Sequence, residues 1–129
     1  MPSADLRRAL ERYADAWTRG DLAAISACYA EDFTLRYFGR HALAGEHVGK
    51  AKALQVLAEF GRRTGRRLLR VVDVATGPAL GALVVREAMG PHATEVERVL
   101  VYTVEGGLLR TCAVFDQDQA LIERLVGSA

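Results

Sequence analysis

The chain has 129 residues, of which 50% are hydrophobic and 26% are charged, and its formal net charge is +1. This length and composition predict one globular domain over residues 1–129, and the near-zero charge gives no reason to expect a nucleic acid partner. No apolar run approaches the ~20 residues of a membrane-spanning helix and no signal pattern opens the chain, so we expect a cytoplasmic protein without a membrane partner.

Residues 5–19 have the apolar spacing of an amphipathic helix. Leu6, Leu10, Tyr13 and Trp17 recur at intervals of three or four residues and so fall on one helical face. This face is expected to pack against the rest of the domain.

A second, shorter helix is expected next, followed by a strand. Asp21 suits its N-cap, and Leu22, Ile25 and Tyr29 would then turn inward. The β-branched and aromatic residues at 32–38 predict the strand.

The segment from Arg36 to Lys50, RYFGRHALAGEHVGK, fits neither a helical nor a strand period. It lacks the Gly-Lys-Ser/Thr ending of a phosphate-binding loop. A third helix is expected to start near Lys50 and to end at Thr64–Gly65. We interpret the arginine-rich run at 62–70 as the basic end of this helix and a solvated strand start rather than as a phosphate site.

Beyond Gly65 the sequence changes to long extended runs separated by Gly-Pro and Gly-Gly pairs, which are typical of hairpin turns. The expected strands are 67–76, 79–89, 95–105 and 108–115. A last helix at 118–126 would begin with a capping box of Asp116 and Gln119. Helices followed by an antiparallel meander predict an α+β fold with the helices on one sheet face.

The turns also predict how the strands pair. The Gly-Gly turn places Tyr102 opposite Thr111, and the turn before it places Glu87 opposite Val96. Because side chains alternate across a sheet, one face is then mostly apolar with a few polar groups, as in small-molecule pockets. The residues of this face are Leu83, Val85, Glu87, Val96, Arg98, Leu100, Tyr102, Thr111, Ala113 and Phe115.

Three stretches carry a family resemblance that covers the chain from Leu6 to Leu125. They are ERYADAWTRGDLAAISACYAEDFTLRY, GRHALAGEHVGKAKALQVLAEF and VYTVEGGLLRTCAVFDQDQALIERL. These stretches resemble the SnoaL-like polyketide cyclases and ketosteroid isomerases of the nuclear transport factor 2 superfamily. The resemblance implies a cone-shaped, curved antiparallel sheet wrapped around N-terminal helices and enclosing a pocket. It places the segment 36–50 at the pocket mouth.

The resemblance also implies roles for individual residues. Tyr13 matches the tyrosine that donates to the developing oxyanion in ketosteroid isomerases. Tyr37 and Leu100 stand where that family has its general base and its protonated aspartate, so steroid-type isomerisation is not expected. Arg98 matches the arginine in the Asp-Arg-Asp arrangement of limonene epoxide hydrolases, but Leu100 replaces a carboxylate there too.

Each polar candidate also has a structural interpretation. Tyr13 and Tyr37 are either hydrogen-bond donors to a substrate oxygen or packed core aromatics, and a lowered pKa would let Tyr37 transfer a proton. Glu87 is the best general-base candidate, because burial on an apolar face would raise its pKa. It is equally placed to form an ion pair with Arg98, which would otherwise hold developing negative charge.

His41, Glu46 and His47 are metal-binding residue types in a loose arrangement. A catalytic zinc requires three convergent ligands, so we expect no metal. We interpret His41 as a pocket-mouth residue that titrates near neutral pH, and Trp17 as part of the pocket wall.

We therefore expect a cofactor-independent acid/base enzyme that isomerises, cyclises or dehydrates a hydrophobic, carbonyl-bearing natural-product intermediate. The residues expected to carry the chemistry are Tyr13, Tyr37, Glu87 and Arg98. Those expected to contact the substrate are Trp17, His41, Leu100, Tyr102 and Phe115. The alternatives are a non-catalytic binding module of the same fold, an epoxide-opening hydrolase or cyclase, and an interaction protein built on the sheet alone.

The opposite sheet face predicts a partner. It would carry Val99, Val101 and Thr103 beside Cys112 and Val114, which is a broad apolar patch for a solvated sheet. The resemblance implies pairing through this face, so we expect a homodimer.

Overall fold

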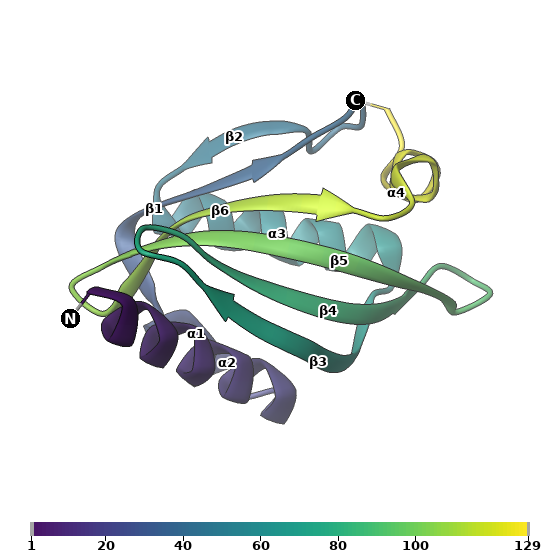
Figure 1. Cartoon of the computed structure of the whole chain (residues 1–129). Helices are drawn as coiled ribbons and strands as arrows, with labels where there is room; N and C mark the ends of the chain where they lie inside the picture. The colour runs from purple at the N-terminus through teal and green to yellow at the C-terminus, as the bar shows by residue number, and fades with distance from the viewer. Residues whose placement is uncertain (1, 129) are drawn as a thin grey trace.

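The computed structural model describes residues 2–128, which form a curved six-stranded sheet with helices on its inner face (Figure 1). The helices are α1 (Pro2–Arg19), α2 (Leu22–Ala27), α3 (Lys50–Thr64) and α4 (Gln119–Val126). The strands are β1 (Tyr29–Tyr37), β2 (Gly45–Val48), β3 (Arg67–Thr76), β4 (Gly81–Met89), β5 (Thr94–Glu105) and β6 (Leu108–Asp116). No helix within residues 2–128 is both long and apolar enough to cross a membrane.

The predicted α+β arrangement is confirmed. The strands lie in the order β2-β1-β6-β5-β4-β3, and the sheet does not close into a barrel (Figure 1). Helix α1 contacts β3 and β4, whereas α3 contacts β1 and β2, so each helix covers one half of the inner face. At Gly81 a Cβ atom would lie 2.4 Å from Leu10 Cδ1, so a larger residue there would have to displace the buried Leu10 side chain of α1. One pair, β1 with β6, is parallel, which the sequence pattern did not indicate.

The second helix is shorter than expected. Asp21 caps it as predicted, and its side chain accepts a hydrogen bond from the Ala24 backbone N–H at 3.1 Å. The prediction that Leu22 turns inward is wrong, because Leu22 is 79% exposed. Tyr29 is buried but begins β1, since the helix ends at Ala27 and the chain enters the sheet at once.

The cap of the last helix was also misassigned. Asp118, not Asp116, accepts a hydrogen bond from the Leu121 backbone N–H at 3.0 Å. Asp116 is the last residue of β6 and is therefore free to point into the molecule.

The segment 36–50 contains a strand that its sequence did not predict. Strand β2 pairs antiparallel with β1 and forms one edge of the sheet. The loop before it docks on α4, where Glu123 accepts hydrogen bonds from the Arg40 backbone N–H at 2.8 and 3.0 Å. Gly39 lies at φ +110°, and a Cβ atom there would come within 2.2 Å of the Glu123 carboxylate, so only glycine fits.

The predicted pairing of β4 with β5 is confirmed. Glu87 lies opposite Val96, and Val85 lies opposite Arg98. Both Glu87 and Arg98 are buried on the inner face, as the alternation predicts.

The predicted pairing of β5 with β6 is wrong by one residue. Val104 pairs with Leu109 but Thr103 pairs with Thr111, so Arg110 is the extra residue of a bulge. Beyond the bulge the two faces of β6 exchange. The inner face carries Cys112, Val114 and Asp116, and the outer face carries Thr111, Ala113 and Phe115.

Candidate functional site

A small cavity lies between the helices and the inner face of the sheet. Its volume is about 20 Å³, which is room for about one water molecule. Aromatic rings and two cations dominate its lining, namely Tyr13, Trp17, Tyr29, Tyr37, Arg66 and Arg98. Leu100 and Tyr102 also line it. Of the nine predicted site residues, six therefore meet at this cavity.

The cavity is approached from a cleft of about 400 Å³. Residues from α1, α2 and α3 line the cleft, and five residues line both spaces: Tyr13, Trp17, Tyr29, Leu57 and Arg66. The approach therefore lies between the helices. The expectation that the segment 36–50 forms the pocket mouth is wrong, because none of its described residues lines the cleft.

Tyr13 belongs to a cluster of aromatic side chains. The Tyr29 hydroxyl donates a hydrogen bond to the Tyr13 hydroxyl at 2.9 Å, so the Tyr13 proton stays available to a third oxygen. The Tyr13 ring centroid lies 5.7 Å from that of Tyr102 and 5.8 Å from that of Trp17. This packing fixes the position of the hydroxyl pair.

Burial keeps these hydroxyls protonated. It raises the pKa of Tyr13 to about 12 and raises the pKa of Tyr29, Tyr37 and Tyr102 above the usual tyrosine value. The suggestion of a lowered pKa for Tyr37 is therefore wrong. These hydroxyls are suited to donate hydrogen bonds and not to abstract protons.

Arg98 lies at the other end of the cavity, between two carboxylates. Its Nη1 donates to Glu87 Oε2 at 3.0 Å, and its Nε and Nη2 donate to Asp116 Oδ1 and Oδ2 at 2.5 and 3.4 Å. Burial alone would lower the pKa of Arg98, but the charges of Glu87 and Asp116 outweigh it and the net shift is upward. Arg98 is thus a permanent buried cation.

Phe60 of α3 connects this charge network to the cavity. The Tyr37 ring stacks on it with centroids 4.7 Å apart. The guanidinium groups of Arg98 and Arg66 lie 4.7 and 5.2 Å from the same ring centroid, within the range of cation–π attraction.

Glu87 is buried on the inner face but is not part of the cavity lining. Its Oε2 pairs with Arg98, which is the structural interpretation raised from the sequence. Its Oε1 has no hydrogen-bond partner among residues 2–128, and Arg66 Nη1 lies 4.0 Å from it.

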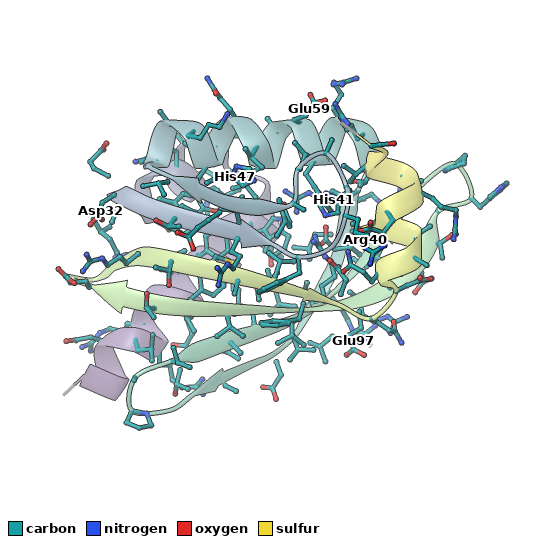
Figure 2. The ribbon with its side chains drawn as sticks, turned by 90° about the horizontal axis from the view of Figure 1, so that it is seen from above. Asp32, Arg40, His41, His47, Glu59 and Glu97 are labelled. Carbon is teal, nitrogen blue, oxygen red and sulfur yellow. The ribbon has the colours of Figure 1, made fainter. Side chains whose placement is uncertain are left out.

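His41 and Phe115 lie away from the cavity. His41 is buried beside the Tyr37 ring, and Figure 2 shows it near α4, at the opposite end of β1 from Asp32. Phe115 is 48% exposed on the outer face, because of the bulge in β6. Within the described part of the chain, no three His, Cys, Asp or Glu side chains are grouped so that they could hold a metal ion.

Three residues of the site were not predicted. Tyr29 was assigned to a helix, Arg66 to a solvated arginine run and Asp116 to a helix cap. For Asp116 a usable signal existed, because Asp118 also precedes the last helix and can act as its cap.

The raised tyrosine pKa values predict how stability depends on pH. The unfolded chain releases its tyrosine protons near pH ~10, whereas the folded chain holds them to higher pH. The free energy of unfolding should therefore fall as the pH rises from the ordinary tyrosine pKa toward about 12, the pKa of Tyr13. Tyrosinate absorbance and circular dichroism should change together in an alkaline titration. Tyrosinate appearing near the ordinary pKa in a chain that is still folded would contradict this.

Known proteins are similar to this chain in sequence. The SnoaL-like domain family matches residues 10–111. The uncharacterized protein Rv0034 of Mycobacterium tuberculosis is 27% identical over 112 residues, which are 84% of this chain and 86% of that protein.

Two solved structures share the fold. Bal32a, from a soil-derived mobile gene cassette, has a TM-score of 0.84 at 15% identity, covering 98% of this chain and 100% of Bal32a. A candidate polyketide cyclase from Sinorhizobium meliloti has a TM-score of 0.70 at 16% identity, covering 89% of this chain and 100% of the cyclase. With the family match spanning most of its length, this chain belongs to the SnoaL-like domain family of the nuclear transport factor 2-like superfamily.

Proposed function

We propose that the protein is a small-molecule enzyme that moves protons to cyclise, isomerise or dehydrate a hydrophobic, carbonyl-bearing compound. The observation that carries this proposal is the convergence of neutral tyrosine hydroxyls and arginines on one cavity, reached through a largely apolar cleft. Proton transfer of this kind needs only side chains and substrate, so the proposal requires no cofactor. The similarity to a candidate polyketide cyclase supports the same reaction class.

The tyrosine pair supplies the electrophilic half of the reaction. A substrate carbonyl oxygen within reach of Tyr13 would accept a hydrogen bond from the Tyr13 hydroxyl. The hydrogen bond that Tyr29 donates to Tyr13 makes the Tyr13 hydroxyl a stronger donor. Negative charge that develops on this oxygen is stabilised more than the neutral carbonyl, which lowers the barrier to forming an enolate.

The proton acceptor is assigned to Glu87. One of its oxygens is held by Arg98 and the other accepts no hydrogen bond from residues 2–128. Glu87 lies behind the cavity lining, so a proton would reach its free oxygen through a bridging water or after a shift of the side chains between them. We do not propose epoxide opening, because Leu100 stands where the resemblance to limonene epoxide hydrolases would place a carboxylate.

The second candidate is a binding module without turnover. It is favoured by the small cavity and by a lining that, in residues 2–128, contains no carboxylate. The two functions differ in one observable: only the enzyme accelerates proton exchange at the carbon beside the ligand's carbonyl group.

Hydrogen–deuterium exchange of 2-tetralone in heavy water, followed by proton NMR, tests the proposal. The wild-type protein should accelerate exchange at the α-carbon, and Tyr13→Phe should slow the catalysed rate by roughly a hundredfold, the cost of losing an oxyanion donor. The substitution removes one hydroxyl and should lower stability by less than ~1.5 kcal/mol.

Thr103→Val is the matched control. It removes a hydroxyl from the outer face, where Thr103 bonds Thr111, and should leave the exchange rate unchanged. If Tyr13→Phe exchanges as fast as wild type, Tyr13 does not carry the chemistry. If wild type does not accelerate exchange of any cyclic or aryl ketone, the binding module is the better account.

We also propose that the protein is a homodimer that pairs through the outer sheet face. The bulge changes the predicted patch, since Cys112 and Val114 are buried inside and Ala113 and Phe115 lie outside in their place. Phe115 stacks on Phe38 at 5.0 Å, and both rings are exposed in the single chain. Exposed aromatic rings beside apolar strand residues are typical of a covered surface.

Light scattering at micromolar concentration should give the mass of a dimer. Phe115→Glu should shift the mass to that of one chain, because it would bury a carboxylate at the interface. Leu22→Glu changes an exposed leucine of α2, which lies among the helices and not on the outer sheet face, and should keep the dimer. A wild-type mass of one chain would reject the proposal.

A further inference from the structure

Arg66 stands where the cleft meets the cavity, and it lines both spaces. Of the described residues that line the cleft, Arg66 is the charged one, and most of the others are apolar or aromatic. The Arg66 side chain is 21% exposed to solvent. A ligand that enters the cavity from the cleft therefore passes this guanidinium.

The guanidinium N–H groups of Arg66 have no hydrogen-bond acceptor among residues 2–128. Its neighbour Arg63 donates to Glu59 at 2.6 Å, but the Arg66 guanidinium donates no hydrogen bond to a described residue. Its ionic contact is to Glu87 Oε1 at 4.0 Å, beyond hydrogen-bond distance. Glu87 itself is bonded to Arg98, so its hold on Arg66 is weak.

Tyr37 is a second unused donor at the same cavity. It is buried, it lines the cavity, and its hydroxyl has no hydrogen-bond partner among residues 2–128. A buried hydroxyl left without a partner is costly, so a polar ligand atom at this point is favoured. A cavity of about 20 Å³ has space for one such atom.

We infer that the ligand of this site is an apolar acid, whose carboxylate pairs with Arg66 and places one oxygen near the Tyr37 hydroxyl. Its hydrocarbon body fills the cleft, whose volume of about 400 Å³ suits a small molecule. The planar guanidinium can donate two parallel hydrogen bonds to a carboxylate, and the apolar walls bury the rest of the ligand. This deepens the proposed function, on which it rests only for the location of the site.

Titration calorimetry with adamantane-1-carboxylate and the neutral adamantane-1-carboxamide tests the inference. The two probes share one hydrocarbon body and differ in charge. The wild-type protein should bind the acid about tenfold more tightly or better, as expected for a charge-assisted pair. Both probes should change the emission of Trp17, the single tryptophan, because it lines the cleft.

Arg66→Gln should abolish the preference for the acid and leave amide binding within about twofold, because the apolar walls are unchanged. Arg66→Lys should retain part of the preference, since the charge remains. Arg67→Gln is the matched control, because Arg67 is exposed and lines neither space, and it should bind both probes as wild type does.

Equal affinity for the two probes, no binding of either, or an acid preference that survives Arg66→Gln would overturn the inference. These outcomes are separate from the exchange assay. If the protein prefers the acid but does not accelerate α-proton exchange, the inference stands and the proposed enzyme activity is rejected. If the protein accelerates α-proton exchange but does not prefer the acid, the proposed enzyme activity stands and the inference is rejected.

Discussion

The ion pairs of Arg98 with Glu87 and Asp116 are the interaction on which the interior depends. Three strands supply these groups, and all three side chains are almost completely removed from solvent. A buried charge is tolerated only when it is paired, so the network fixes how β4, β5 and β6 lie against one another. It also explains the bulge at Arg110, because only the shifted register turns Asp116 toward Arg98.

The network divides the interior into two chemically different ends. At one end, burial keeps the tyrosine hydroxyls protonated, and aromatic packing fixes their positions. At the other end, Phe60 lies against the guanidinium groups of Arg98 and Arg66. Arg98 is paired with two carboxylates, whereas the Arg66 guanidinium donates no hydrogen bond to residues 2–128. The cavity between the two ends has room for one polar ligand atom and the cleft has room for an apolar body, so the same division supports both a proton-transfer enzyme and a selective binder.

The sequence predicted the features that depend on periodicity and turns. The register of β4 with β5 followed from the turn between them, and alternation then placed Glu87 and Arg98 correctly on the inner face. The β6 register failed because one inserted residue is invisible to alternation when both faces are largely apolar. Strand β2 was missed because it is short and lies at an edge, and Arg66 because burial cannot be assigned within a run of five arginines.

Urea unfolding of Arg98→Met, compared with Arg86→Met, tests the central role of this network most directly. Arg98→Met should lower the free energy of unfolding by about 3–5 kcal/mol, because it leaves Glu87 and Asp116 buried without a cation. Among residues 2–128, the ionic contacts of Arg86 are to Glu95 and Glu97 at 3.8 and 4.0 Å, and solvent screens them, so Arg86→Met should cost less than ~1 kcal/mol. Adding Glu87→Gln and Asp116→Asn to Arg98→Met should recover part of the loss. A loss for Arg98→Met no greater than that for Arg86→Met would contradict the account.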